Sequence, residues 1–324
     1  MKLVTINAPG GGRIGAKLTN GMVLDVSQSV RPGTLETWIP HTVSGVLQAG
    51  PDGMDLLRRL VDGIETASSS RLEQLHEKSA LLPVDTPLLA PLPTPSLIVS
   101  AGMAYRSHLE EMKTAAPKNP SGFIKARSSI IGPEAPIFLP KQAPNMVDFE
   151  GEFSCVIGRR CYNVSPEEAM ESVVGYTIIN DVSARDWVEA ALGPKEPQAA
   201  AAGWRLNHLG KQYPTFCPMG PVFATKDEFK DPPDLALTTR LNGELMQSAQ
   251  TGDLIFSIGE TIAYFSRWYQ FEPGDIVTTG SPAGVGYGRE PKLFMKDGDV
   301  VSIEVEGLGV LRNPVRTLRN QEER

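Results

Sequence analysis

The feature that most constrains this chain is a proline-rich stretch, PVDTPLLAPLPTP, which spans residues 83–95 and contains five prolines. Proline has no N–H to donate and its ring clashes inside a helix, so this stretch cannot form a helix interior or a central strand. A chain of 324 residues is also long for one compact core, and its length suggests about two domains. We therefore predict a small N-terminal α+β domain over residues 1–83, a linker over 84–95 and a larger C-terminal domain over 96–324.

The composition limits the partners of this protein. Hydrophobic residues make up 41% and charged residues 21%, as in ordinary globular proteins. No apolar run approaches the roughly 20 residues of a transmembrane helix, and no apolar signal segment is visible. The net charge of −7 argues against a nucleic-acid partner, and the three cysteines form no CxxC pair. These features predict a cytoplasmic protein that binds neither membranes nor nucleic acid.

Gly/Pro-punctuated strands with few helices dominate the C-terminal part and predict an α+β, mostly β fold. The Asn242-Gly243 pair, between apolar-polar runs, predicts a hairpin. Ser165 and Glu168 occupy the two positions of a capping box and predict the start of a helix. The Ala- and Pro-rich segment 188–210 is predicted to be a loop or lid.

Two acidic side chains, Glu150 and Glu152, lie one residue apart in the strand-like segment VDFEGEFSCVIG (147–158). Alternate strand residues share a face, so two carboxylates stand side by side, unless this is simply a solvated acidic edge. Gly151 between them leaves room for a close approach from the opposite face. A divalent cation such as Mg²⁺, Mn²⁺ or Ca²⁺ would relieve the repulsion, because hard cations prefer carboxylate oxygens. Asp181, after an apolar run, is the candidate third ligand; alone, it would more commonly be a turn residue or pair with Arg185.

Four motifs occur in one order: DFEGEFSCVIG, GYTIINDVSARD, GKQYPTFCPMGP and PGDIVTTGSPAGVG. From about Leu97 to its C-terminus the chain resembles the fumarylacetoacetate hydrolase family in these motifs. The N-terminal opening resembles the small N-terminal domain of many members. The resemblance implies a mixed β-sandwich or roll, a homodimer, and binding of Mg²⁺ or Mn²⁺ by Glu150, Glu152 and Asp181.

A candidate general base lies in AYRSHLEEM, where His108 and Glu111 are three residues apart and share a helix face. A carboxylate beside an imidazole fixes its tautomer and raises its basicity, although most such pairs are solvated surface pairs. The segment resembles the family motif G-x-N-Y-x-x-H-x-x-E, with Ala104 in place of Asn and Tyr105 matching. In hydrolytic members this His–Glu pair activates water, and Tyr105 is a candidate for substrate binding.

Two lysines are candidates through the resemblance, although most lysines are simply solvated. Lys211 matches the family's lysine and is expected to stabilise an oxyanion or enolate. Lys125 resembles the lysine of the family's F-x-K-P motif, although Ala126 replaces Pro. It is expected to meet a substrate carboxylate or a nearby acid, and Arg185 is a further candidate for substrate binding.

The Gly-rich segment TTGSPAGVG (278–286) follows an apolar strand and lacks the features of a P-loop. Its free N–H groups and the hydroxyls of Thr279 and Ser281 are suited to holding a carboxylate, with Gly280 between them. The alternative is an ordinary tight turn. Ser281 stands where the family usually has Thr.

These features favour a metal-dependent hydrolase that cleaves a C–C bond in a β-diketo acid of the acylpyruvate or fumarylacetoacetate kind. The first alternative is an isomerase, decarboxylase or hydratase that acts on a 2-oxo acid, because all of these reactions need a stabilised enolate. The second alternative is a non-catalytic binding protein. The expected partners are a small 2-oxo acid and a second copy of the chain.

Overall fold

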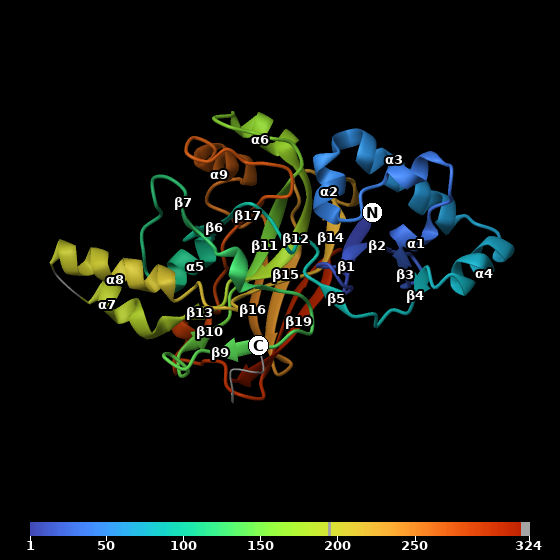
Figure 1. Cartoon of the computed structure of the whole chain (residues 1–324). Helices are drawn as coiled ribbons and strands as arrows, with labels where there is room; N and C mark the ends of the chain where they lie inside the picture. Colours follow the sequence, from blue (N-terminus) through green and yellow to red (C-terminus); the bar gives the residue numbers. More distant parts are fainter. Residues whose placement is uncertain (194–195, 319–324) are drawn as a thin grey trace.

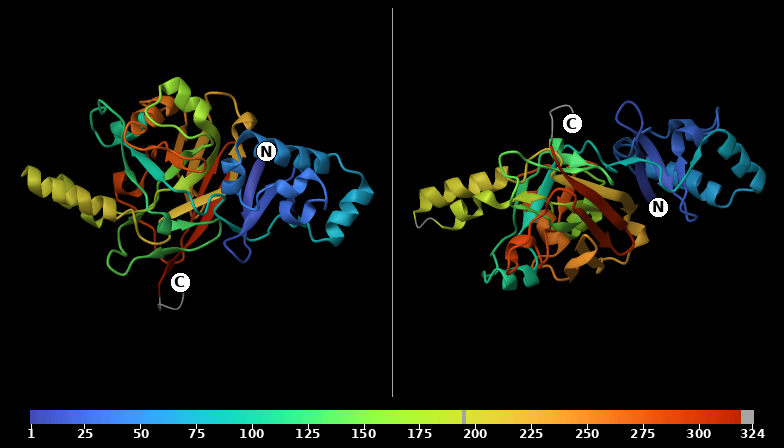
Figure 2. Two further views of the ribbon diagram at one scale, coloured as in Figure 1. Left: turned by 45° about the horizontal axis from the view of Figure 1, so that its top comes forward. Right: turned by 90° about the horizontal axis from the view of Figure 1, so that it is seen from below.

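The computed structural model describes residues 1–193 and 196–318. Strands of two sheets form the body of the molecule, and helices surround them (Figure 1). The N-terminal helices lie on one side of this body, and a pair of helices, α7 and α8, projects from the opposite side (Figures 1 and 2). Within the two described ranges, no helix is long and apolar enough to cross a membrane.

The N-terminal part consists of short antiparallel strands followed by helices. Its elements are β1 (Lys2–Ile6), β2 (Arg13–Lys17), β3 (Val23–Asp25), α1 (Val26–Ser29), η1 (Leu35–Trp38), α2 (Val43–Gln48), α3 (Gly50–Glu65), α4 (Ser69–Glu77) and β4 (Leu81–Leu82). The helix α3 buries Met54, Leu57, Val61 and Ile64, which recur at three- and four-residue spacing along one face. That face covers the N-terminal strands.

One large sheet continues from the N-terminal part into the rest of the chain. Its order is β4-β3-β2-β1-β14-β12-β11-β17-β6-β7, with β5 paired to β1 and β8 paired to β14. The further strands are β5 (Leu88–Leu89), β6 (Ile98–Gly102), β7 (Ser121–Ile124), β8 (Ile130–Ile131), β11 (Gly151–Ile157), β12 (Val173–Asn180), β14 (Cys217–Thr225) and β17 (Ile276–Thr278). The proline-rich segment therefore contributes a short strand beside β1, and the division of the chain into domains stays a prediction.

The second sheet has the order β16-β15-β18-β19-β9, and β10 pairs with β13 in a separate ribbon. These strands are β9 (Ile137–Leu139), β10 (Val147–Asp148), β13 (Ser183–Ala184), β15 (Ala236–Leu241), β16 (Glu244–Gln250), β18 (Val300–Val305) and β19 (Gly309–Thr317). The predicted hairpin between β15 and β16 is confirmed. Asn242 and Gly243 have φ values of 53° and 85°, as a tight hairpin turn requires.

The remaining helices lie at the ends and edges of the sheets. They are α5 (Arg106–Glu111), η2 (Arg127–Ser129), α6 (Pro166–Ser172), η3 (Arg185–Trp187), α7 (Val188–Leu192), α8 (Pro197–Leu209), η4 (Lys226–Glu228), α9 (Ile258–Phe265) and η5 (Gly286–Gly288). The predicted capping box at the start of α6 is confirmed, because the Ser165 and Glu168 side chains each accept a hydrogen bond from the other's backbone N–H.

The alternation of β11 explains how the two sheets share a core. Phe153 and Cys155 are buried in one apolar cluster with Leu237 and Ile303 of the second sheet. Because strand residues alternate between faces, Glu152 points to the opposite face of the large sheet. The fold is thus the expected α+β, mostly β sandwich, and its acidic face looks away from the second sheet.

Candidate active site

Gly151 permits the second sheet to pack closely behind the two glutamates. A Cβ atom at Gly151 would lie 2.3 Å from Thr239 Oγ1 and 3.1 Å from Ile303 Cγ2. The sequence predicted that another backbone or a ligand would approach Gly151, whereas side chains of the second sheet occupy this space. Because every other side chain is larger, only glycine lets the two sheets meet directly beneath the carboxylates.

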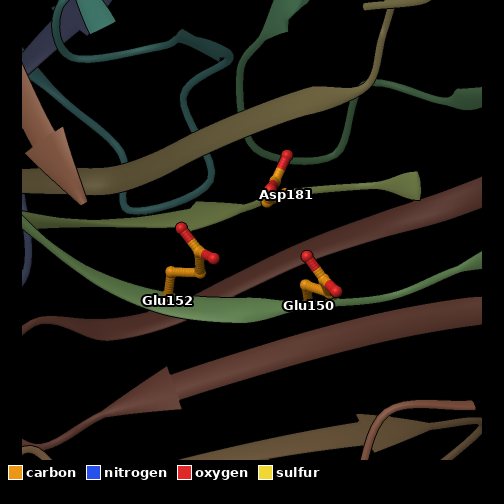
Figure 3. A group of neighbouring side chains, drawn as sticks. All are labelled: Glu150, Glu152 and Asp181. Carbon is orange, nitrogen blue, oxygen red and sulfur yellow. The ribbon is translucent and has the colours of Figure 1, made fainter. Parts of the chain in front are cut away.

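The three predicted metal ligands lie together in the structure (Figure 3). Glu150, Glu152 and Asp181 each offer a carboxylate oxygen, and these oxygens lie within 4.8 Å of one another. Glu150 and Glu152 rise from the start of β11, and Asp181 faces them from the end of the neighbouring strand β12 (Figure 3). Their exposed fractions are 7%, 1% and 1%, which excludes a solvated acidic edge.

Two buried lysines contact this carboxylate cluster. Lys211 Nζ donates to Glu150 Oε2 (2.6 Å), Asp181 Oδ2 (2.8 Å) and Ser183 Oγ (2.7 Å). Lys125 Nζ donates to Asp181 Oδ1 (2.5 Å) and to the carbonyl oxygen of Lys211 (2.7 Å). Lys125 therefore meets a nearby acid, which is one of the two partners expected for it.

Arg185 is also buried, but it does not pair with Asp181 as the alternative from the sequence suggested. Its guanidinium contacts Asp148 (2.9 Å) and Glu150. Asp148 in turn accepts hydrogen bonds from the backbone N–H groups of Gly286 (2.7 Å) and Tyr287 (3.0 Å). Arg185 and Asp148 thus connect Glu150 to the end of the Gly-rich segment.

The charges of this buried cluster do not balance when all of its groups are ionised. Four carboxylates, Asp148, Glu150, Glu152 and Asp181, face three cations, Lys125, Arg185 and Lys211.

Glu152 is the carboxylate left over. Among the described residues it contacts no basic side chain, and Ser100 Oγ lies 3.4 Å from its Oε2. Burial, together with the charges of Asp181 and Glu150, raises the pKa of Glu152 well above its usual range. Burial would also raise the pKa of Glu150, but Arg185 and Lys211 outweigh burial and hold it far below that range.

The triad fits a divalent cation on two grounds. Its donors are all carboxylate oxygens, which Mg²⁺ and Mn²⁺ prefer, and one of them lacks a positive partner. An added dication would supply that charge, because burying a carboxylate without a counter-charge is costly. Glu150, Glu152 and Asp181 are the residues that would hold it.

The predicted His–Glu pair is formed on α5. His108 Nδ1 lies 3.1 Å from Glu111 Oε2, and the two side chains are 13% and 18% exposed. Glu111 Oε1 accepts a hydrogen bond from the N–H of Gly284 (2.9 Å). Burial alone would raise the pKa of Glu111, but the bonds from His108 and Gly284 lower it. Nδ1 is thus the ring nitrogen that faces Glu111.

The Gly-rich loop packs against the start of α5. Thr279 Oγ1 lies 3.3 Å from Tyr105 Oη and donates to the carbonyl oxygen of Phe153 (2.9 Å). Gly280 has a φ of +80°, and a Cβ there would lie 3.2 Å from the Cβ of Ala104. The loop thus lies between β11 and the His–Glu helix, while binding of substrate by its hydroxyls stays a prediction.

The predicted loop over 188–210 is wrong where the structure describes it, because residues 188–192 and 197–209 form the helices α7 and α8. Residues 194–195 lie outside the described residues, and a role of the segment as a lid stays a prediction. Pro197 occupies a first-turn position, where its missing N–H is harmless, and the alanines that follow favour helix. His208 of α8 stacks on Phe123 of β7 with ring centroids 5.4 Å apart, and Lys211 Nζ lies 5.3 Å from the same ring. His208 of α8 and Lys211 therefore lie against the same aromatic ring.

The fold and the site together define a class: an enzyme of the fumarylacetoacetate hydrolase superfamily, with two packed sheets, a buried carboxylate triad and a His–Glu pair. The family model described as "Fumarylacetoacetate (FAA) hydrolase C-terminal" matches residues 97–316. The chain belongs to the fumarylacetoacetate hydrolase family.

Two relatives show how far this similarity extends. The oxaloacetate tautomerase FAHD2B, mitochondrial, of Bos taurus is 37% identical over 318 residues, which cover 97% of this chain and 91% of that protein. The oxaloacetate tautomerase fahd2, mitochondrial, of Xenopus laevis is 42% identical over 228 residues, which cover 70% of this chain and 68% of that protein.

Three solved structures are similar to this one. The fumarylacetoacetate hydrolase of Exiguobacterium antarcticum has a TM-score of 0.74 at 32% identity, and the match covers 98% of this chain and 100% of that chain. The 5-carboxymethyl-2-hydroxymuconate delta-isomerase of Mycobacterium smegmatis has a TM-score of 0.59 at 38% identity, and the match covers 74% of this chain and 82% of that chain. The third is the maleylpyruvate hydrolase of Sphingobium sp. SYK-6, solved in complex with manganese (II) ion and pyruvate. It has a TM-score of 0.72 at 25% identity, and the match covers 98% of this chain and 99% of that chain.

Proposed function

We propose that this protein is a divalent-metal-dependent tautomerase that interconverts the keto and enol forms of oxaloacetate or a similar 2-oxo diacid. The observation that carries the proposal is the match with an oxaloacetate tautomerase over 97% of this chain. The buried carboxylate triad and the His–Glu pair of this chain supply the groups that such a reaction needs. The first expectation from the sequence was C–C bond hydrolysis, and its first alternative was isomerisation. The similarity to oxaloacetate tautomerases favours isomerisation over hydrolysis.

Tautomerisation moves one proton from C3 of the 2-oxo acid to its O2 and uses no water. When bound by Glu150, Glu152 and Asp181, a dication would polarise the 2-oxo group and stabilise the negative charge of the enolate. His108 is oriented by Glu111, so its free Nε2 takes the proton from C3 and gives it to O2. One residue thus serves as base and then as acid.

Cationic and hydroxyl groups account for the binding of the anionic substrate. Lys211 lies against both Glu150 and Asp181, so its ammonium adds positive charge where the enolate oxygen forms. Thr279 and Ser281, with the N–H of Gly280, are assigned to a substrate carboxylate. Tyr105 is assigned to the same region, because its hydroxyl lies beside Thr279.

C–C bond hydrolysis is the second candidate, and the His108–Glu111 pair supports it. In hydrolytic members of the family this pair activates water, and the structurally similar maleylpyruvate hydrolase has a hydrolytic name. The same histidine can take a proton from water or from C3. The presence of His108 alone therefore does not distinguish hydrolysis from tautomerisation.

A product panel tests the proposal. The purified chain, supplied with Mn²⁺ or Mg²⁺, is given oxaloacetate, acetylpyruvate and fumarylacetoacetate. Enol decay is followed by ultraviolet absorbance, and cleavage products are followed by chromatography. We expect metal-dependent, EDTA-sensitive tautomerisation of oxaloacetate that exceeds cleavage of either diketo acid. Efficient cleavage with no gain in tautomerisation over buffer would refute the proposal and favour the hydrolase. Light scattering of the same sample tests the predicted homodimer.

A further inference from the structure

The side chain of Gln247 in β16 contacts the acidic strand from the opposite sheet. It is fully buried, and its Oε1 accepts a hydrogen bond from the N–H of Gly151 (3.0 Å). Gly151 lies between Glu150 and Glu152, so this bond holds the backbone of the residue that separates the two glutamates. It lies on the face of the large sheet that the carboxylates do not use.

The other end of the same amide holds the Gly-rich loop. Gln247 Nε2 donates to Ser281 Oγ (2.8 Å) and to the carbonyl oxygen of Pro282 (2.9 Å). A flipped amide would set its NH₂ against the Gly151 N–H and its oxygen against the Pro282 carbonyl, so only one orientation satisfies all three partners. Gln247 therefore joins two segments in a fixed manner.

A bulge in β16 aims this side chain and supports the loop a second time. Thr239 pairs with Gln247 and Arg240 pairs with Leu245, so Met246 is the extra residue. The Met246 carbonyl oxygen accepts a hydrogen bond from Arg289 Nη2 (2.6 Å). A Cβ at Gly284 would lie 2.1 Å from that oxygen, so the loop packs directly on the bulge.

The loop then reaches the general base. The N–H of Gly284 donates to Glu111 Oε1 (2.9 Å), and Glu111 Oε2 lies 3.1 Å from His108 Nδ1. A continuous path thus runs from the backbone of Gly151 through the Gln247 side chain to the loop. It follows the loop over residues 282–284 and reaches the imidazole of His108 through Glu111. Gln247 contacts both the acidic strand and the loop segment that leads to Glu111.

We propose that Gln247 is a positioning residue that fixes the separation between the carboxylate triad and the His108–Glu111 pair. This role rests on the proposed function, since it concerns the proton transfer by His108. A displacement of about 1 Å between reacting groups costs up to ~100-fold in rate. Loss of the amide therefore affects turnover more than it affects metal binding, because β11 stays paired with β12 and β17.

The test uses Gln247→Glu, which keeps the shape and the Gly151 contact but sets a carboxylate oxygen against the Pro282 carbonyl. Gln247→Met, which removes all three hydrogen bonds, is the second variant. Gln250→Glu on the same strand is the matched control, because Gln250 is exposed. In the metal-loaded protein we expect Gln247→Glu to lower kcat by ~10- to 100-fold, with KM and the Mn²⁺ dissociation constant changed by less than ~3-fold.

A folded Gln247 variant with the kcat of the control would overturn the proposal. So would a parallel loss of Mn²⁺ affinity, which would place the effect in the triad alone. Hydrogen exchange by mass spectrometry gives a readout that needs no substrate: the segments 279–286 and 106–112 should exchange faster in the Gln247 variants than in the control. If the wild-type protein does not act on oxaloacetate, the proposed function fails, while unchanged exchange in both segments would separately refute the coupling.

Discussion

The unbalanced charge at Glu152 leads to an unusual prediction for the pair of glutamates. Glu152→Gln removes a buried carboxylate that has no basic partner, whereas Glu150→Gln removes one that contacts both Arg185 and Lys211. Both substitutions are the same chemical change, two residues apart. In the metal-free protein at pH 8 we expect them to change the free energy of unfolding in opposite directions.

The magnitudes follow from the electrostatics of each site. Burial and the neighbouring acids raise the pKa of Glu152, so ionisation of this carboxyl costs free energy in the folded protein, and the neutral amide should raise the free energy of unfolding. Breaking a buried ion pair from one side costs about 3 to 5 kcal/mol, which applies to Glu150→Gln. Both variants should lose Mn²⁺ binding, which at 100 times its dissociation constant adds about 2.7 kcal/mol to the wild-type protein.

Urea unfolding with and without Mn²⁺ measures these differences, and calorimetry measures the affinity for the ion. The expected order of metal-free stability is Glu152→Gln, then wild type, then Glu150→Gln, and only the wild type should gain from Mn²⁺. If Glu152→Gln destabilised the metal-free protein as much as Glu150→Gln, the charge count would be wrong. Wild-type Mn²⁺ affinity in either variant would refute the assignment of the triad.

Three further predictions concern the base, the glycine and the lysine. His108→Ala should lower kcat by ~100- to 10,000-fold while calorimetry still detects Mn²⁺ binding; retained turnover would remove it from the mechanism. Gly151→Ala should lower the free energy of unfolding by about 1 to 3 kcal/mol, because a Cβ at residue 151 would lie 2.3 Å from the Thr239 hydroxyl. Adding Thr239→Ala to that variant should restore part of the lost stability. Lys211→Met should destabilise the metal-free protein by about 3 to 5 kcal/mol and lower kcat, and a melting temperature equal to that of the wild type would contradict the buried pairs.

The sequence was most informative where chemistry and periodicity coincide. Two glutamates at alternate positions of an apolar strand predict paired carboxylates, and the structure brings Asp181 beside them. The spacing of His108 and Glu111 predicts a contact on one helix face, which the structure also has. In each case the local geometry of one element already determines most of the arrangement.

Contacts between elements could not be predicted in this way. Asp148 stands at a third alternate position before Glu150 and Glu152, but its partner Arg185 becomes visible only when β10 and β13 pair. Gln247 has no sequence signal at all, because its partners belong to the other sheet and to a distant loop. The helices α7 and α8 contradict the predicted loop for a different reason, because the alanines of this segment favour helix and Pro197 is tolerated in the first turn of α8.

A cluster of acidic and basic residues that served only to stabilise the fold would not account for the charge of this site. A cluster retained for stability alone would place a cation beside each buried acid, because an unpaired buried charge is costly. Here Lys125, Lys211 and Arg185 contact Asp148, Glu150 and Asp181, and none of them contacts Glu152. The chain therefore keeps an uncompensated carboxylate at the point where the three ligand oxygens converge. That arrangement is unfavourable in the isolated protein and favourable once a further cation is bound, so it is best explained as a site built to bind one.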